Sequence, residues 1–168
     1  AVFRFNPIPD EAIKERLRYI ADNEGVSYEE EGLDAIVYVA EGDLRRAINI
    51  LQTASAFGEV VSANLVYRVA GIASPQEVRD MIQLAIRGDF IKARATLRDL
   101  MISYGMSAED IVRQLHREIM ALPDLSDAVK AELAYYIGET DFRITEGSHG
   151  DIQLSALLAK LAAVGGRS

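Results

Sequence analysis

The sequence predicts an all-α protein, and three observations lead to this fold class. Nearly every segment after residue 9 repeats its apolar residues at intervals of three and four, the spacing of one helix face. Residues that favour helix starts and ends, chiefly serine, aspartate, proline and glycine, punctuate these segments. No two neighbouring stretches alternate apolar and polar residues as a β-hairpin would. A longer interruption at 71–75 divides the helices into two domains.

The first two helices follow from this punctuation. We expect the first helix to begin at Pro9, because proline suits the first helical position and acidic residues follow it. It ends at Gly25. The spacing between Ser27 and Glu30 is that of a capping box, which predicts a second helix that runs to Gly42. The buried stripe of the first helix is Ile13, Leu17 and Ile20.

The third helix starts within 42–49, the most informative segment of the chain. Gly42 can end the second helix in a left-handed conformation, and Asp43 can cap the third with its carboxylate. Helical spacing then continues to about residue 57 along the apolar stripe Leu44, Ala47, Ile48, Leu51 and Ala54. Arg45 falls on the neighbouring face in the first turn. This arginine is therefore expected beside the core and not in it.

A short fourth helix over 62–70 completes the first domain, which we assign to residues 1–73. The spacing from Ser74 to Glu77 is again that of a capping box, with proline at the first helical position, and it opens a second domain over 74–168. We expect five further helices, at about 75–87, 90–104, 108–121, 127–146 and 151–164, followed by a frayed tail.

The composition allows a packed core and excludes several kinds of site. The chain has 168 residues, 49% of them hydrophobic, enough for one domain or two small ones. Its net charge of -8 argues against a general attraction to DNA phosphates. The lack of cysteine excludes disulfides, thiolate catalysis and cysteine-ligated metals. The two isolated histidines, His116 and His149, do not indicate a metal site.

The apolar runs and the first residues bear on localisation and completeness. No run reaches the roughly 18 to 20 apolar residues of a membrane-spanning helix, and the start does not resemble a signal peptide. We therefore expect a cytoplasmic protein, or a nuclear one in a eukaryote, with no membrane partner. The first nine residues alternate like a short strand and begin without methionine. They indicate a piece of a longer polypeptide, with a processed start as the alternative.

The chain lacks the parts that bind and hydrolyse a nucleotide. A P-loop needs Gly-x-x-x-x-Gly-Lys-Ser/Thr, whose amides and lysine surround the phosphates, and no Gly-Lys pair occurs in the sequence. An acidic pair that would hold magnesium after an apolar strand is missing as well. This chain is therefore not a complete P-loop ATPase, and we expect no catalytic residue in it.

Arg45 and Arg46 have three interpretations on sequence physics alone. They are a solvated pair at a helix start, part of a DNA-binding helix, or a phosphate sensor that another domain completes. The solvated pair is favoured because adjacent arginines are common on helices. The acidic residues around the pair argue against DNA binding. A second basic stretch is interpreted as a solvated face; it contains Arg87, Lys92, Arg94 and Arg98.

Several longer runs are distinctive beyond their helical spacing. They are Arg4-Phe5-x-Pro7, Glu15-Arg16-Leu17-x-Tyr19-Ile20-Ala21, Ala40-Glu41-Gly42-Asp43-Leu44-Arg45-Arg46-Ala47-Ile48-Asn49, Leu51-Gln52, Gly88-Asp89-Phe90-x-Lys92-Ala93-Arg94, Ile137-Gly138-Glu139-x-x-Phe142-Arg143 and Gln153-Leu154-x-Ala156-Leu157-Leu158-Ala159. Together these runs resemble the small subunits of replication factor C, most closely the archaeal ones, over essentially the whole chain. The run around Arg45 resembles the second sensor of AAA+ ATPases.

This resemblance implies a fold and a function. The fold would be a small helical AAA+ lid domain followed by a five-helix collar domain, without the ATPase domain that precedes them in the family. The family is a clamp loader, which uses ATP and magnesium to load a sliding clamp onto primed DNA in replication. By resemblance, Arg45 is the nucleotide-sensing residue that contacts the γ-phosphate in the intact subunit.

The resemblance also implies partners. Other clamp-loader subunits, large and small, would bind through the collar, and the clamp and primer-template DNA would join the intact complex. Whether the fragment forms a homo-oligomer stays open, and we expect no cofactor bound to it alone. The alternative function is a freestanding helical DNA-binding module that uses Arg45 and Arg46.

Overall fold

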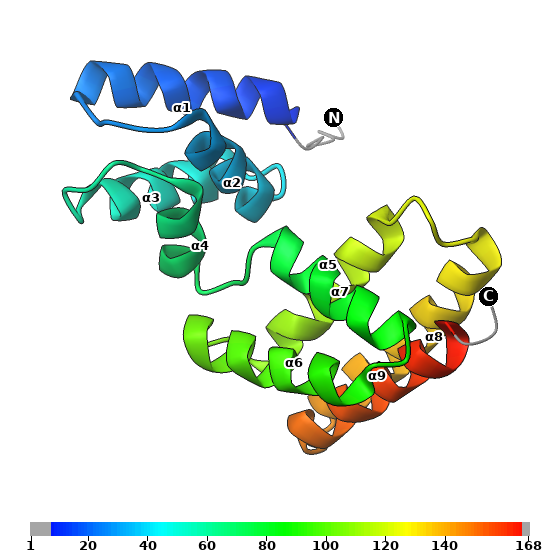
Figure 1. Cartoon of the computed structure of the whole chain (residues 1–168). Helices are drawn as coiled ribbons and strands as arrows, with labels where there is room; N and C mark the ends of the chain where they lie inside the picture. The colour runs from blue at the N-terminus through cyan, green and yellow to red at the C-terminus, as the bar shows by residue number, and fades with distance from the viewer. Residues whose placement is uncertain (1–7, 166–168) are drawn as a thin grey trace. The chain divides into compact units, whose positions relative to one another are not determined.

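The chain folds into helices that form two compact units, Ala1–Gly71 and Ile72–Ser168 (Figure 1). The computed structural model describes residues 8–165, and within them it contains nine α-helices and no strand. The all-α prediction is therefore confirmed. The strand expected before Pro7 and the frayed end at 166–168 lie outside the described residues.

The first unit consists of four helices around one core. They are α1 (Asp10–Glu24), α2 (Glu30–Ala40), α3 (Leu44–Ser55) and α4 (Ala63–Ala70). The α2 helix packs against the other three. Its residues Leu33 and Ile36 are fully buried, together with Ile13 and Leu17 of α1 and Leu51 of α3. The spacing of these residues is what fixes the buried face of each helix.

The starts of the first two helices differ from the prediction. Pro9 precedes α1 as its cap instead of occupying its first position. The capping box at Ser27 does not form, and α2 begins at Glu30. The physical reason is a long-range pairing: Val61 donates its N–H to the carbonyl of Ser27 at 2.9 Å and accepts the N–H of Glu29 at 3.1 Å. This pairing holds residues 27–29 extended.

The turn between α2 and α3 is tight and left-handed at two consecutive residues. Glu41, with φ of 52°, ends α2, where we expected Gly42 to do so, and Gly42 follows with φ of 82°. The N–H of Asp43 closes the turn on the carbonyl of Ala40 at 3.0 Å. A non-glycine residue in this region is uncommon.

The buried face of α3 is rotated slightly from the predicted stripe. Ile50 is buried, while Leu44 and Ile48 are only half-buried. The helix ends at Ser55, two residues earlier than expected. The remaining predicted core positions are buried: Ala47, Leu51 and Ala54.

The second unit contains the other five helices. They are α5 (Pro75–Ile86), α6 (Phe90–Tyr104), α7 (Ala108–Ala121), α8 (Asp127–Thr145) and α9 (Gly150–Gly165). Their order and bounds agree with the prediction to within one residue at each end. The capping box of Ser74 and Glu77 is confirmed, with proline at the first position of α5. The α9 helix packs against each of the other four.

The segment between the two units is anchored in the second. The buried Ala73 donates its N–H to Met106 Sδ at 3.3 Å and accepts a hydrogen bond from Gln114 Nε2 at 2.6 Å. Gly71, with φ of 67°, ends α4 in the left-handed conformation. The assignment of residues 1–73 to a lid and of 74–168 to a collar stays a prediction.

Candidate functional site

Arg45 is the second residue of α3 and lies on the surface. Its guanidinium forms no hydrogen bond or ion pair with any residue that the structure describes. A guanidinium keeps its charge at every physiological pH and offers a planar fork of donors that matches phosphate oxygens. The side chain is therefore charged, solvated and available to a ligand from outside the unit.

The start of α3, which carries Arg45, is capped. Asp43 caps the helix, because its Oδ1 accepts the N–H of Arg46 at 3.0 Å, and its carbonyl accepts the N–H of Ala47 at 3.0 Å. The N–H groups of the first turn have no carbonyl acceptor within the helix. Together they give the helix start a partial positive charge that favours anions. Arg45 adds a full charge at the same end.

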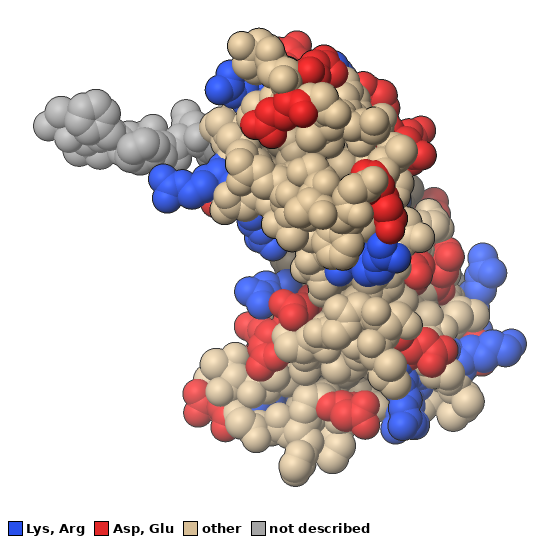
Figure 2. Space-filling view, turned by 90° about the vertical axis from the view of Figure 1, so that its left-hand side faces the viewer, with Lys and Arg blue, Asp and Glu red and all other residues tan. Residues whose placement is uncertain are grey.

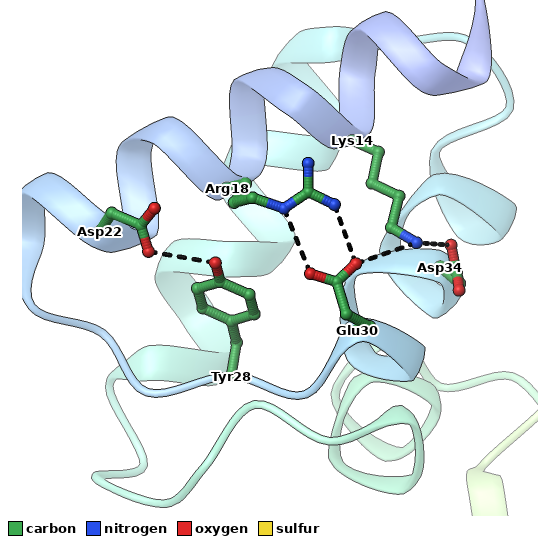
Figure 3. Close-up of polar contacts among 6 residues, drawn as sticks. All are labelled: Lys14, Arg18, Asp22, Tyr28, Glu30 and Asp34. Atoms are coloured by element: carbon green, nitrogen blue, oxygen red, sulfur yellow. Dashed lines mark hydrogen bonds and ion pairs between the residues drawn. The ribbon is translucent and has the colours of Figure 1, made fainter.

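Two cations of the first unit, Lys14 and Arg18, are paired in a cluster between α1 and α2 (Figure 3). Lys14 Nζ lies 2.6 Å from Asp34 Oδ1 and 3.1 Å from Glu30 Oε2. Arg18 binds both oxygens of Glu30, at 3.2 and 2.9 Å. No local sequence pattern indicates this cluster, because each cation is 12 or more residues from the carboxylate it binds. Arg45 and its neighbour Arg46, by contrast, form no ion pair with any described residue.

The same cluster shifts the acid titration of Glu30. Hydrogen bonds from Arg18 and then from Lys14 lower the pKa of Glu30 from its ordinary value of 4.5 to about 2. A carboxyl group with a lowered folded-state pKa contributes stability above its unfolded pKa and loses it as the pH falls toward the folded value. The cluster therefore stabilises the first unit above about pH 4.5 and progressively less toward pH 2.

Replacing Glu30 with glutamine is expected to reduce this acid sensitivity. The variant should unfold at a lower urea concentration than the unmodified chain at pH 7, and the difference should shrink between pH 4.5 and 2. Urea unfolding across this range measures it. Glu31→Gln is the matched control, because Glu31 lies in the same helical turn and forms no ion pair with a described residue. A pH-independent difference would contradict the titration.

The described residues do not form a cluster that could hold a metal ion. No cluster of three or more histidine, aspartate and glutamate side chains is found among them. His116 lies on the exposed face of α7 and His149 in the turn before α9, so the structure does not bring them together. No helix in the described part is long and apolar enough to span a membrane. The arrangement at Arg45 can bind an anion.

The surface charge bears on the DNA-binding alternative. On the face shown in Figure 2, basic and acidic side chains are interspersed, with no continuous basic area. Proteins that bind DNA through its backbone present clustered lysine and arginine. This face of the molecule therefore gives the alternative no support.

Comparisons with known proteins match both units. The family of the replication factor C C-terminal domain matches residues 73–160, and the RCF1/5-like AAA+ ATPase lid domain matches 15–56. The replication factor C small subunit of Aeropyrum pernix is 53% identical over 96% of this chain, and that of Archaeoglobus fulgidus is 51% identical over 96%. The small subunit of Methanocaldococcus jannaschii is 53% identical over 98% of the chain and is covered over 9% of its own length.

These matches also show how much of the relatives the chain represents. It spans about half the length of the Aeropyrum and Archaeoglobus subunits, 50% in each case. The predicted resemblance is confirmed on both units, and the match to the C-terminal domain alone covers more than half of the chain. The chain therefore belongs to the replication factor C family.

Proposed function

We propose that this chain supplies the lid and the collar of a clamp-loader small subunit, and that Arg45 senses the nucleotide. The observation that carries the proposal is the uncommitted, exposed guanidinium at the capped start of α3. This position lies within the segment that matches the AAA+ lid domain. The relatives are replication factor C small subunits, which supports a clamp loader acting where the chromosome is replicated, in the archaeal cytoplasm.

The residues present fit one part of a nucleotide site. A P-loop and a magnesium-binding acidic pair are not found in this sequence, so ATP and magnesium would be held by the ATPase domain of the intact subunit. ATP supplies the terminal phosphate whose hydrolysis drives the cycle. The Arg45 guanidinium donates hydrogen bonds to that phosphate, while the start of α3 adds its partial charge. This chain alone turns over no nucleotide.

Such a contact couples the nucleotide to the position of the lid. ATP offers Arg45 a phosphate that ADP lacks, so the two nucleotides bind the lid-closed state with different free energies. A charge-assisted hydrogen bond contributes about 1.5 to 3 kcal/mol, which changes a closed-to-open ratio about tenfold or more. The collar would transmit this change to the other subunits, and the assembled loader would act on the sliding clamp and primed DNA.

Replacing Arg45 with alanine in the intact subunit tests this function. We expect ATP-dependent clamp loading by the assembled complex to fall about tenfold or more, because one charge-assisted contact to phosphate is lost. The fold should persist, since Arg45 is exposed and outside the core. Loading of a labelled clamp onto primed DNA measures the rate, and circular dichroism checks the fold.

Arg46→Ala is the matched control for this experiment. Arg46 is the next residue of the same helical turn, is also exposed, and its replacement removes the same charge. It is expected to change loading much less, because its side chain is on another face of α3. If Arg45→Ala loads the clamp at the normal rate and binds nucleotide with normal affinity, the proposal that Arg45 senses the nucleotide is refuted.

A further inference from the structure

The exposed side of α3 carries no negative charge. The helix contains no aspartate or glutamate, although the chain has 26 acidic and 18 basic residues. Its exposed side chains are basic, amide and hydroxyl groups: Arg45, Arg46, Asn49, Gln52 and Thr53. No side chain of α3 itself therefore competes with an external anion for the two arginines.

Three of these residues form one stripe along the helix. Helical spacing places Asn49 four residues and Gln52 seven residues after Arg45, on the same side of α3. Side chains four residues apart on a helix are neighbours, with their Cβ atoms about 5 to 6 Å apart. Helical side chains also tilt toward the start of their helix. The amide of Asn49 therefore leans toward the turn that carries Arg45.

The side-chain amides of this stripe are not used within the part of the chain that the structure describes. Neither Asn49 nor Gln52 forms a side-chain hydrogen bond there. Their backbone carbonyls do accept hydroxyl groups, that of Asn49 from Thr53 at 2.8 Å and that of Gln52 from Ser55 at 2.9 Å. A side-chain amide offers one oxygen acceptor and two N–H donors. Asn49 thus brings an unused acceptor next to the unused guanidinium of Arg45.

The guanidinium of Arg45 has more donors than a phosphate group engages. It carries five N–H groups in one plane, and a bidentate contact with phosphate oxygens uses two of them. Under the proposed function the lid closes over the nucleotide, and such closure displaces water from a site. A donor that is left there without an acceptor costs free energy. A second acceptor beside Arg45 therefore strengthens its contact with phosphate.

A carboxylate at this spacing would act differently, as α8 demonstrates. There Glu139 and Arg143 are also four residues apart, and their side chains pair at 3.2 Å. Such a pair engages the arginine before any ligand arrives and places a negative charge beside it. Because like charges repel, a carboxylate next to Arg45 would disfavour phosphate. The uncharged oxygen of Asn49 accepts a hydrogen bond without this repulsion.

We infer that Asn49 is a positioning residue for Arg45. When Arg45 donates to the terminal phosphate of ATP, Asn49 Oδ1 accepts one of its remaining N–H groups and fixes the plane of the guanidinium. The inference rests on the proposed function of Arg45 and adds a second residue to the same site. Asn49 acts through Arg45 and does not itself contact the nucleotide.

The absence of this hydrogen bond among the described residues agrees with a contact that forms only with ligand bound. Ordering two exposed side chains costs conformational entropy, so the pair gains little by itself. Phosphate orders Arg45 first, and the hydrogen bond to Asn49 then costs less entropy. The contribution of Asn49 is therefore expected in nucleotide binding and not in the stability of the chain.

Nucleotide affinities of the intact subunit, assembled in its complex, test the inference. The ratio of the dissociation constants for ADP and ATPγS, each with magnesium, gives the preference for ATP. Asn49→Ala should lower this preference about three- to tenfold, the effect of one hydrogen bond. The fold should persist, because Asn49 is exposed, and circular dichroism checks it.

Gln52→Ala is the matched control. It removes an exposed amide from the same stripe, but Gln52 lies about 10 Å from Arg45 along the helix, at 1.5 Å per residue. The control is expected to leave the preference for ATP unchanged.

Asn49→Asp separates the charge of this residue from its shape, since the two side chains have nearly the same size. We expect it to lower the preference for ATP more than Asn49→Ala does. The difference should shrink as salt is raised, because the added charge is then screened. Equal effects of the two substitutions would contradict the requirement for an uncharged acceptor.

A double variant shows whether Asn49 acts through Arg45. Adding Asn49→Ala to Arg45→Ala should change the preference for ATP no further, because no guanidinium is left to position. Additive effects would overturn the inference, since Asn49 would then contribute independently of Arg45.

The outcomes also distinguish this inference from the proposed function. If Arg45→Ala leaves the preference for ATP unchanged, the sensor is refuted, and the role of Asn49 is refuted with it. If Arg45→Ala lowers the preference but Asn49→Ala does not, only the role of Asn49 is refuted. The same holds if Gln52→Ala lowers the preference as much as Asn49→Ala does.

Discussion

Replacing Gly32 with alanine is expected to lower the free energy of unfolding by about 2 kcal/mol, within the range for overpacking. In most helices this change would stabilise, since alanine is the better helix former by about 1 kcal/mol. In α2, however, a Cβ atom would overlap the carbonyl oxygen of Val61. That oxygen also accepts the N–H of Glu29 at 3.1 Å, so it cannot retreat without breaking the pairing that holds residues 27–29. Urea unfolding measures the loss.

Gly138→Ala in α8 is the matched control. Both glycines lie inside helices, but a Cβ atom at Gly138 meets nothing within 4 Å. The same substitution is therefore expected to stabilise by up to about 1 kcal/mol, the difference in helix propensity. If both substitutions change stability in the same direction, the close approach at Val61 is not what determines the effect of Gly32.

The parts of the fold that depend on neighbouring residues could be predicted from the sequence. The capping box of Ser74 and Glu77 forms as expected, because its two partners are only three residues apart in the sequence. The cap of α3 by Asp43 is equally local. Each short loop of the second unit contains glycine or serine, so its five helices could be placed to within one residue at each end.

The predictions that were wrong concern residues engaged by distant partners. Ser27 has the right spacing to cap α2, but its backbone pairs with Val61 and the Glu30 carboxylate binds Lys14 and Arg18. Gly42 is left-handed as expected, but α2 ends one residue earlier, at Glu41, which is left-handed as well. No local pattern reveals such contacts, because they form only once helices far apart in sequence are packed together.

For the candidate site too, the local sequence predicted the position of the residue but not its role. The position of Arg45 beside the core followed from the helical spacing of α3, and the structure places it there, exposed. Its role could not be predicted from these residues, because a solvated arginine and a phosphate sensor would form the same contacts within this chain. What distinguishes them is a domain that would carry the nucleotide, and the resemblance of the surrounding run supplied that part of the hypothesis.

Replacing Arg79 with methionine is expected to lower the free energy of unfolding by about 3 kcal/mol, as is usual when one partner of a buried ion pair is removed. Arg79 Nε on α5 lies 2.6 Å from Glu118 Oε2 on α7. The side chain of Arg79 is 42% exposed, whereas that of Glu118 is 1% exposed. Stability is therefore lost because the buried Glu118 carboxylate remains desolvated after its ion pair with Arg79 is removed.

Two further variants separate this cost from the loss of a surface charge. Arg113→Met removes an exposed arginine on the same α7 helix that lies 3.1 Å from the half-buried Asp110, and is expected to cost below about 1 kcal/mol. Adding Glu118→Leu to Arg79→Met should recover most of the stability, since an apolar pair replaces a buried ion pair at little cost. Equal losses for Arg79→Met and Arg113→Met, or no recovery in the double variant, would show that burial of Glu118 does not set the energy of this pair.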